Sequence, residues 1–169
     1  MIISLKKVTE DDITSEVIRW YENVEIIRFS DNQYRNFTID SQREYIRKSN
    51  RDKNLWLRGI YVDDTYVGNI VLNDIQSNHK RAELTYLIGN RNYWGKGIAA
   101  KSIELSIQYA RSLSLNKVYA GVSSKNYGSQ KVLIKNGFIL EGIRTKHLYY
   151  NKQFTDQLDY GLVLKYDRE

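Results

Sequence analysis

Two glycines, Gly95 and Gly97, lie between a strand-like run and a helical pattern. The run 82–88 is typical of a strand, and after the turn apolar residues recur at helical spacing: Ala99, Ile103, Ile107 and Ala110. Glycine permits a tight turn and a close approach of a ligand to the backbone, and the first N–H groups of a helix lack helical partners. The segment 92–99 therefore predicts a helix start that can bind a diphosphate.

Taken alone, this turn has other interpretations. Glycine also serves tight turns that bind nothing. A dinucleotide-binding fingerprint is expected near the start of a repeated strand-helix-strand array and has a third glycine, but position 100 is Ala. The turn alone thus leaves two choices, an anion site to which Lys96 adds a cation, or a structural turn.

The length and composition favour one domain. A chain of 169 residues, 41% of them hydrophobic, can form one real core but not two comfortable ones. We therefore expect a single domain over residues 1–169. No apolar run reaches the length of a membrane span, and the start of the chain is charged too soon for a secretory signal. We expect a cytoplasmic protein with no membrane partner.

The chain has no cysteine, which excludes disulfides, thiolate catalysis and sulfur-ligated metal sites. Its two histidines, His79 and His147, are far apart in the sequence and have no carboxylates at ligand spacing. We therefore expect no metal site.

The formal net charge of +6 favours anionic partners. The basic residues are scattered along the chain, which fits a phosphate-bearing cofactor or substrate. Nucleic acid would require a basic helix or a platform of aromatic rings with arginines, and the 14 tyrosines are spread through the predicted elements. We therefore expect no nucleic-acid partner.

The remaining patterns predict an α+β order. Caps at Thr9 and Thr38 predict two helices, and Asp63-Asp64 and Asn151-Lys152 predict turns between strands. Further elements are expected as strands at 3–8, 54–62, 65–75, 117–122, 138–141, 145–150 and 158–166, and as a helix at about 128–135 that ends at Asn136-Gly137. This order predicts a mixed central β-sheet flanked by helices.

The motifs that follow the glycine turn form a specific combination. The chain carries W-G-K-G at 94–97, N-x-x-S at 126–129, K-N-G-F at 135–138 and E-G at 141–142. In this order they resemble the GNAT superfamily of acyl-CoA-dependent N-acetyltransferases, over essentially the whole chain. The resemblance is greatest to the branch with the ribosomal-protein N-terminal acetyltransferases, and more distant to the spermidine acetyltransferases. It implies a single-domain GNAT fold and acetyl-CoA as cofactor.

The resemblance also implies where the coenzyme lies. The backbone of the turn would hold its pyrophosphate: Trp94, Gly95, Lys96, Gly97, Ile98 and Ala99. Leu87 and Ile88 would offer main-chain hydrogen bonds to the pantetheine arm, and Asn126 and Ser129 would contact the coenzyme from the other side. The family loop begins with Gln or Arg where this chain has Asn92, so the charge at this place is either supplied by the neighbouring Arg91 or missing.

The expected chemistry requires a base, because an amine must be neutral to attack a thioester. Glu83 is the candidate base, and a cross-strand ion pair with Arg81 is its alternative role. Backbone N–H groups near Leu87 and Ile88 are the expected donors to the oxyanion. Many relatives have a tyrosine as general acid where this chain has Leu133.

Ser129 is therefore the candidate donor to the departing sulfur, although a hydroxyl at a helix start also serves as a cap. Tyr149 and Tyr150 are further candidate acids.

The acceptor amine is expected between segments 28–38 and 145–156. The residues assigned to it are Arg28, Tyr34, Arg35, Tyr149 and Asp156. The cationic and aromatic first segment favours a nucleotide-linked amino sugar, then a protein N-terminus, then a polyamine, which would need carboxylates. A solvated loop, a GNAT-fold module that binds acyl-CoA without turnover, and a homodimer are left open.

Overall fold

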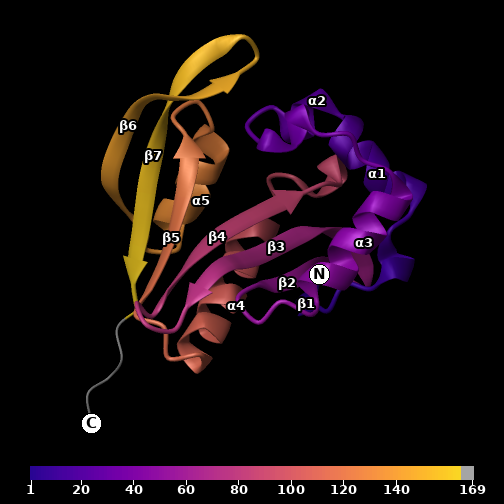
Figure 1. Cartoon of the computed structure of the whole chain (residues 1–169), viewed down its shortest axis with the longest axis horizontal. Coiled ribbons are helices and arrows are strands. Elements are labelled where there is room, and N and C mark those ends of the chain that lie inside the picture. The colour runs from indigo at the N-terminus through magenta and orange to yellow at the C-terminus, as the bar shows by residue number, and fades with distance from the viewer. Residues whose placement is uncertain (165–169) are drawn as a thin grey trace.

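The computed structural model of the chain describes residues 1–164. Its centre is a seven-stranded sheet in the order β1-β2-β3-β4-β5-β7-β6 (Figure 1). The strands are β1 (Ile3–Lys6), β2 (Trp56–Val62), β3 (Thr65–Gln76), β4 (Arg81–Ile88), β5 (Lys117–Ser123), β6 (Ile139–Tyr150) and β7 (Gln153–Val163). The β4–β5 pair is parallel and the other pairs are antiparallel, so the predicted mixed sheet is confirmed.

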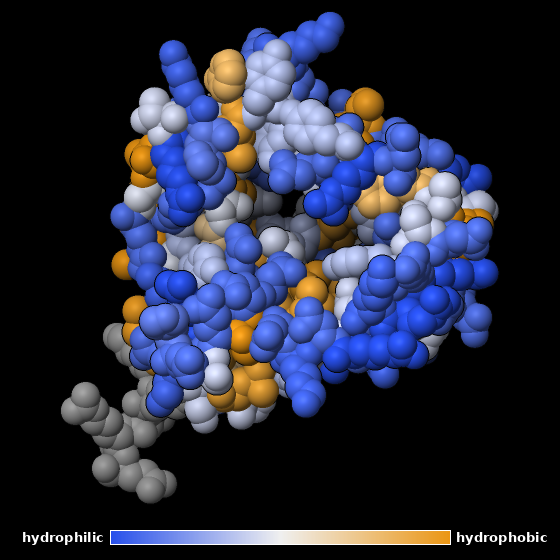
Figure 2. Space-filling model, viewed as in Figure 1, coloured by the Kyte–Doolittle hydropathy of each residue, from blue (hydrophilic) through white to orange (hydrophobic). Residues whose placement is uncertain are grey.

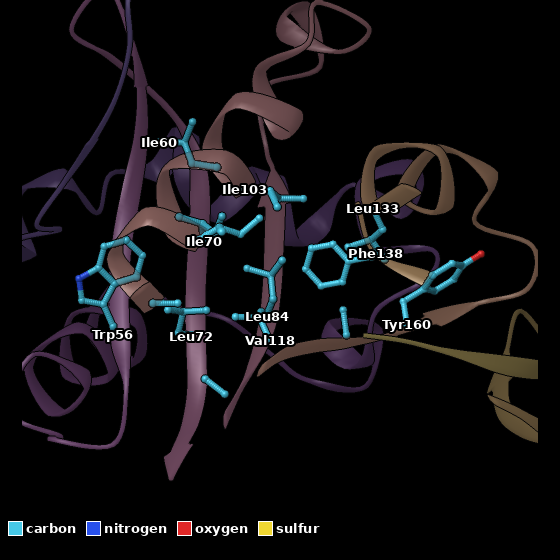
Figure 3. Close-up of a cluster of buried hydrophobic side chains, with 14 of the residues drawn as sticks. Trp56, Ile60, Ile70, Leu72, Leu84, Ile103, Val118, Leu133, Phe138 and Tyr160 are labelled. Carbon is cyan, nitrogen blue, oxygen red and sulfur yellow. The ribbon is translucent and has the colours of Figure 1, made fainter. Parts of the chain in front are cut away.

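The helices cover both faces of this sheet. They are α1 (Ser15–Glu22), α2 (Val24–Ile27), α3 (Ile39–Ser49), α4 (Ile98–Ser112) and α5 (Tyr127–Lys135), with short 3-10 turns η1 (Glu10–Asp12), η2 (Asp31–Tyr34) and η3 (Arg91–Tyr93). Helices α4 and α5 share the larger core with side chains such as Ile70, Leu84 and Val118 (Figure 3). On the opposite face, α1 and α3 pack with Leu57 and Val71.

Both predicted tight turns are confirmed. Asp63 and Asp64 join β2 to β3 with φ of 45° and 67°, and Asn151 and Lys152 join β6 to β7 with φ of 52° and 60°. Two consecutive residues with positive φ are the requirement of the turn whose twist matches a hairpin. The described part of β7 ends at Val163, and the end of the strand predicted at 158–166 lies outside the described residues.

The helix predicted from Thr9 is wrong in its boundary. Thr9 and Asp12 form a capping box around the single turn η1, and the chain is extended again at Ile13 before α1 begins after Thr14. The phenol of Tyr61 donates to Asp12 at 2.8 Å, so a contact with a distant strand holds this turn apart from α1.

The two strands predicted at 138–141 and 145–150 are one strand, β6. Its pairing with β7 shifts register at two places, and Lys146 has a φ of 49°. The register shift takes the main-chain N–H of Lys146 out of the β6–β7 ladder. This N–H instead donates to the carboxylate of Asp156 at 2.7 Å. A bulge therefore replaces the predicted break.

The parallel strands β4 and β5 separate along their length. Only residues Arg81–Glu83 of β4 pair with residues Lys117–Tyr119 of β5. Beyond them, β4 continues beside β3 to Ile88, and β5 continues beside β7 to Ser123. The sheet therefore opens toward the carboxyl ends of its two central strands, as expected for the predicted fold.

Candidate active site

A cleft of about 500 Å³ lies where β4 and β5 separate. Its walls are residues 83–87 of β4, residues 120–123 of β5 and the start of α5, and residues from segment 29–37 line another side. Figure 2 shows the molecule hollowed near its centre. The separated strands expose to this space main-chain groups that a continuous sheet would pair.

The alternation of β4 decides which main-chain groups face the cleft. Gly89 N–H donates to Val67 O at 2.8 Å, so these two residues form a hydrogen-bonded pair. From there the β3–β4 pairing continues without a break to Glu83. Hydrogen-bonded pairs alternate in an antiparallel ladder, so Leu87 directs its N–H and C=O to β3. Tyr86 and Ile88 direct theirs toward β5, across the cleft.

The start of α4 is open and lacks a cap. Gly95 and Gly97 have φ of 72° and 77°, and a Cβ built at either glycine would have no heavy atom within 4 Å. Gly97 is the N-cap of α4 and supplies no side-chain acceptor, whereas the other four α-helices of the described chain have a capping side chain: Thr14, Asn23, Thr38 and Asn126. Unpaired N–H groups that face open space fit a diphosphate.

Side chains of the turn tie it to the end of β4. The indole Nε1 of Trp94 donates to Ile88 O at 2.8 Å, which leaves the Ile88 N–H as the group directed toward the cleft. The guanidinium of Arg91 lies 5.5 Å from the Trp94 ring centroid, and Lys96 Nζ lies 5.5 Å from the Tyr93 ring centroid. Two cations therefore lie on the same turn as the open helix start.

These turn residues do not line the large cleft. Arg91 and Asn92 instead line a smaller cavity of about 250 Å³ together with residues of α1, among them Arg19 and Trp20. The positions predicted for the pyrophosphate therefore lie at the end of β4, beside the cleft.

Glu83 lies in the cleft wall at the point where β4 and β5 part. Burial raises the pKa of its carboxyl group, and repulsion by Asp74 adds to this, while Arg144 lowers it. Within the described residues Glu83 has no ion pair, and the guanidinium of Arg81 lies over the Tyr119 ring at 5.9 Å. The alternative of an Arg81–Glu83 ion pair is therefore wrong.

Ser129 and Asn126 lie at the start of α5, and both line the cleft. Asn126 is the N-cap of this helix, and its Oδ1 accepts from Ser129 N–H at 3.2 Å. The Ser129 hydroxyl does not cap the helix but accepts from the phenol of Tyr86 on β4 at 3.0 Å. Burial raises the pKa of Tyr86. Leu133, one turn further along α5, is a core residue with 1% exposure.

Sequence reasoning missed Tyr86. The signal lies in the alternation of β4, because Leu84, Tyr86 and Ile88 share the face that packs toward α4 and α5. A polar tip on that face requires a partner there, but the identity of the partner depends on how α5 packs.

Of the five residues predicted to bind the acceptor, one lines the cleft. Arg35 lines the cleft. The other four do not: Arg28 pairs with Glu25, Tyr34 donates to Tyr149 O, Tyr149 packs on Phe154, and Asp156 accepts from Lys146 N–H. Asp31 and Tyr150, which were not assigned to the acceptor, do line it.

The open helix start can hold a diphosphate, and the cleft between the separated strands can hold reacting groups, which is the arrangement expected of an acyltransferase that uses an acyl-coenzyme A. The family model described as "Acetyltransferase (GNAT) domain" matches residues 3–139. The chain therefore belongs to the GNAT acetyltransferase family.

Named relatives agree with this family. The probable N-acetyltransferase YjcK of Bacillus subtilis is 30% identical over 151 residues, which are 85% of this chain and 81% of the relative. The ribosomal-protein-serine acetyltransferase of Escherichia coli is 29% identical over 106 residues, 62% of this chain and 59% of the relative.

Solved structures confirm the fold. The spermidine N-acetyltransferase of Vibrio cholerae in complex with CoA and spermine has a TM-score of 0.84 at 20% identity, over 95% of both chains. The microcin C7 self-immunity acetyltransferase MccE in complex with acetyl-CoA and AMP has a TM-score of 0.82 at 24% identity, over 96% of this chain and 92% of the other.

The chain is thus a GNAT-family N-acetyltransferase that uses acetyl-CoA, which confirms the expected enzyme class and cofactor. In the part of the chain described here, no helix is both long enough and apolar enough to cross a membrane.

Proposed function

We propose that this enzyme acetylates the primary amine of an amino sugar, and that the sugar is linked to a nucleotide. Support comes from side chains that line the cleft. They include aromatic rings and neutral amides: Tyr21, Phe29, Phe37, Tyr45, Asn32, Gln42 and Asn69. Rings pack against the C–H faces of a sugar, amides pair with its hydroxyls, and Arg35 suits a phosphate.

The carboxylates near the cleft argue against a polyamine. Asp31 accepts from Tyr150 at 2.8 Å, and Asp159 pairs with Arg144 at 2.7 Å. A polyamine carries several ammonium groups and needs several carboxylates to hold them. Glu83 lacks an ion pair within the described residues, and one carboxylate suits a substrate with one amine.

A protein N-terminus is the second candidate acceptor. It is favoured by the relative named as a ribosomal-protein-serine acetyltransferase, at 29% identity. A single α-amine would also need only one carboxylate at the site of transfer.

The coenzyme would be held by the turn before α4. The backbone from Trp94 to Ala99 would bind its pyrophosphate, with Lys96 and Arg91 as nearby cations. The Ile88 N–H would bind the pantetheine arm, since its carbonyl accepts from Trp94. On the other side, Asn126 uses Oδ1 as a helix cap and has Nδ2 to offer the arm.

Glu83 would act as the general base for direct attack by the amine in a ternary complex. An amine with an ordinary pKa of ~10.4 costs about 4 to 5 kcal/mol to deprotonate at pH 7. The raised pKa of Glu83 makes its carboxylate a better proton acceptor than an exposed one. Acetyl-CoA supplies an acyl thioester with a good leaving group. The N–H group of Tyr86, which also points away from β3, is the candidate donor to the charge that develops on the acyl oxygen.

The test is a panel of amines incubated with acetyl-CoA. The panel contains a uridine-diphosphate amino sugar, the same free amino sugar, a peptide with a serine N-terminus, and spermidine. Thiol release and a mass increase of one acetyl group are measured for each amine.

We expect the highest kcat/KM with the nucleotide-linked sugar, and a lower value with the free sugar because Arg35 loses its phosphate partner. A preference for the peptide or for spermidine would refute the amino-sugar proposal. Absence of turnover with every amine of the panel would refute the proposal that the acceptor is an amino sugar, a protein N-terminus or a polyamine.

A further inference from the structure

The hydroxyl of Ser129 is already engaged by a buried phenol. Tyr86 Oη on β4 lies 3.0 Å from Ser129 Oγ on α5, and both residues line the cleft. The phenol is the more acidic of the two hydroxyls and therefore the better donor. The serine oxygen thus accepts, and the serine proton is left to point elsewhere.

The other polar groups near Ser129 leave few directions for that proton. Its own N–H is bound to Asn126 Oδ1 at 3.2 Å. On the α5 side, the next residue on this face is Leu133, which is apolar and buried. Within the described residues no acceptor for the Ser129 hydroxyl proton is found, so the cleft itself is the direction that offers one.

We infer that Tyr86 is a positioning residue, which fixes the Ser129 hydroxyl so that it donates a hydrogen bond to the sulfur of the coenzyme in the cleft. This inference rests on the proposed function, because it assumes that the sulfur lies beside the start of α5. It explains how the chain manages with Leu133 where many relatives have an acidic tyrosine.

The bonds and protons of the acetyl transfer balance while Tyr86 and Ser129 both keep their protons. The amine nitrogen forms a bond to the acyl carbon, the carbon–sulfur bond breaks, and the sulfur leaves with the electron pair. Glu83 takes the proton that the nitrogen loses and passes it to solvent, and solvent protonates the thiolate after departure. Ser129 and Tyr86 keep their protons and stabilise the departing thiolate by a hydrogen bond.

Burial supports a permanent donor at position 86. The pKa of Tyr86 is raised by burial, so the phenol keeps its proton over the pH range in which the enzyme works. A free serine hydroxyl would divide its time among three rotamers, and the phenol selects among them.

The first experiment is a double-mutant cycle of Tyr86→Phe and Ser129→Ala, with kcat and the KM for acetyl-CoA as readouts. We expect Tyr86→Phe to lower kcat about tenfold, as for loss of one hydrogen bond in the transition state, with little change in KM. In the Ser129→Ala background, Tyr86→Phe should have no further effect. Equal effects of Tyr86→Phe in both backgrounds would overturn the inference.

The matched control is Tyr61→Phe. Tyr61 is a buried tyrosine of β2 whose hydroxyl donates to Asp12 at 2.8 Å, and neither residue lines the cleft. This variant also deletes a phenol hydroxyl that donates to a side chain, so unchanged kcat excludes a general effect of losing such a hydrogen bond.

The second readout does not depend on turnover. The thiol of bound coenzyme A is titrated by the ultraviolet absorption of its thiolate in the wild type, the two single variants and the double variant. A donor at the sulfur lowers the thiol pKa, so we expect a higher value in Tyr86→Phe, and equal values in Ser129→Ala and the double variant. An unchanged thiol pKa in Tyr86→Phe would refute the positioning role.

The two readouts separate the two hypotheses. A wild type that shows the expected thiol titration but acetylates no amine would refute the proposed function and support the positioning role. A wild type that acetylates amines, with additive variants and an unchanged thiol pKa, would support the function and refute the role of Tyr86.

Discussion

The phenol of Tyr150 donates to the carboxylate of Asp31 at 2.8 Å, across 119 residues of sequence. The contact joins the end of β6 to η2, and in Figure 1 the tip of the β6–β7 hairpin lies opposite the segment that holds α2. Asn151 Nδ2 adds a second bond to Arg28 O at 3.3 Å. The two segments expected to enclose the acceptor are therefore tied directly to each other.

Loss of the Tyr150–Asp31 hydrogen bond should weaken acceptor binding without changing the affinity for the coenzyme. The pKa of Tyr150 is raised by burial and by Asp31, so the phenol remains a donor at working pH. We expect Tyr150→Phe to raise the acceptor KM at least tenfold, because one hydrogen bond to a charged group contributes about 1.5 to 3 kcal/mol. Steady-state kinetics and calorimetry with coenzyme A give the two quantities.

Asp31→Asn is the graded comparison, because its amide oxygen still accepts from Tyr150 and the loss should be smaller. Equal KM values in all three proteins would show that the tie does not shape the acceptor site.

Glu83→Gln should lower the rate most at low pH. At low pH little free amine is present, and the carboxylate must remove a proton; at high pH the amine is already neutral and the base matters less. We expect the ratio of wild-type to variant kcat/KM to fall steadily as pH rises. A ratio that is constant with pH would indicate a structural role for this side chain.

The same substitution should stabilise the protein at neutral pH. The pKa of Glu83 is raised in the folded state, so the fold disfavours its ionised form. The destabilisation is complete above the raised folded pKa and vanishes below the unfolded value of about 4.3. Glu83→Gln should therefore raise Tm at pH 7 and lose this advantage as pH falls below that value, as thermal denaturation at several pH values would show. A lower Tm at pH 7 would mean that Glu83 stabilises the fold.

Local signals in the sequence were sufficient to predict the turn before α4. The glycine turn at 95–97 depends on residues within a few positions, and such signals survive any tertiary arrangement. The turn at Asp63-Asp64 was predictable for the same reason.

Contacts between distant elements could not be predicted in this way. The Tyr86–Ser129 bond joins residues 43 apart, and it exists because β5 separates from β4 and lets α5 pack beside the cleft. The position of β7 between β5 and β6 could not be predicted from the sequence either, because strand order is decided by packing and not by local pattern. Single residues such as Tyr34 and Asp156 were assigned to the acceptor site by their segment alone, and their side chains have other partners.

Gly97→Trp should abolish coenzyme binding. Open space lies in front of this glycine, and an indole there would occupy the place proposed for the pyrophosphate. The residue has a φ of 77°, so a side chain also costs about 1 to 2 kcal/mol of stability. We expect a loss of coenzyme affinity of at least a hundredfold by calorimetry, in a protein that still unfolds cooperatively.

Gly142→Trp on β6 is the control for the indole, because this glycine also has open space around its Cβ position but lies on another element and has no positive φ. Full affinity in Gly97→Trp would show that the coenzyme binds elsewhere.

Asn126→Ala should affect both stability and coenzyme binding, and Thr38→Ala separates the two effects. Each residue is an N-cap whose side chain accepts from the third helical N–H, Asn126 on α5 and Thr38 on α3. Loss of such a cap costs about 1 kcal/mol, so both variants should lower Tm to a similar extent. Asn126 lines the cleft and Thr38 does not. We therefore expect weaker binding of coenzyme A, measured by calorimetry, in Asn126→Ala alone. Equal affinity in the two variants would mean that Asn126 serves the helix and does not contact the coenzyme.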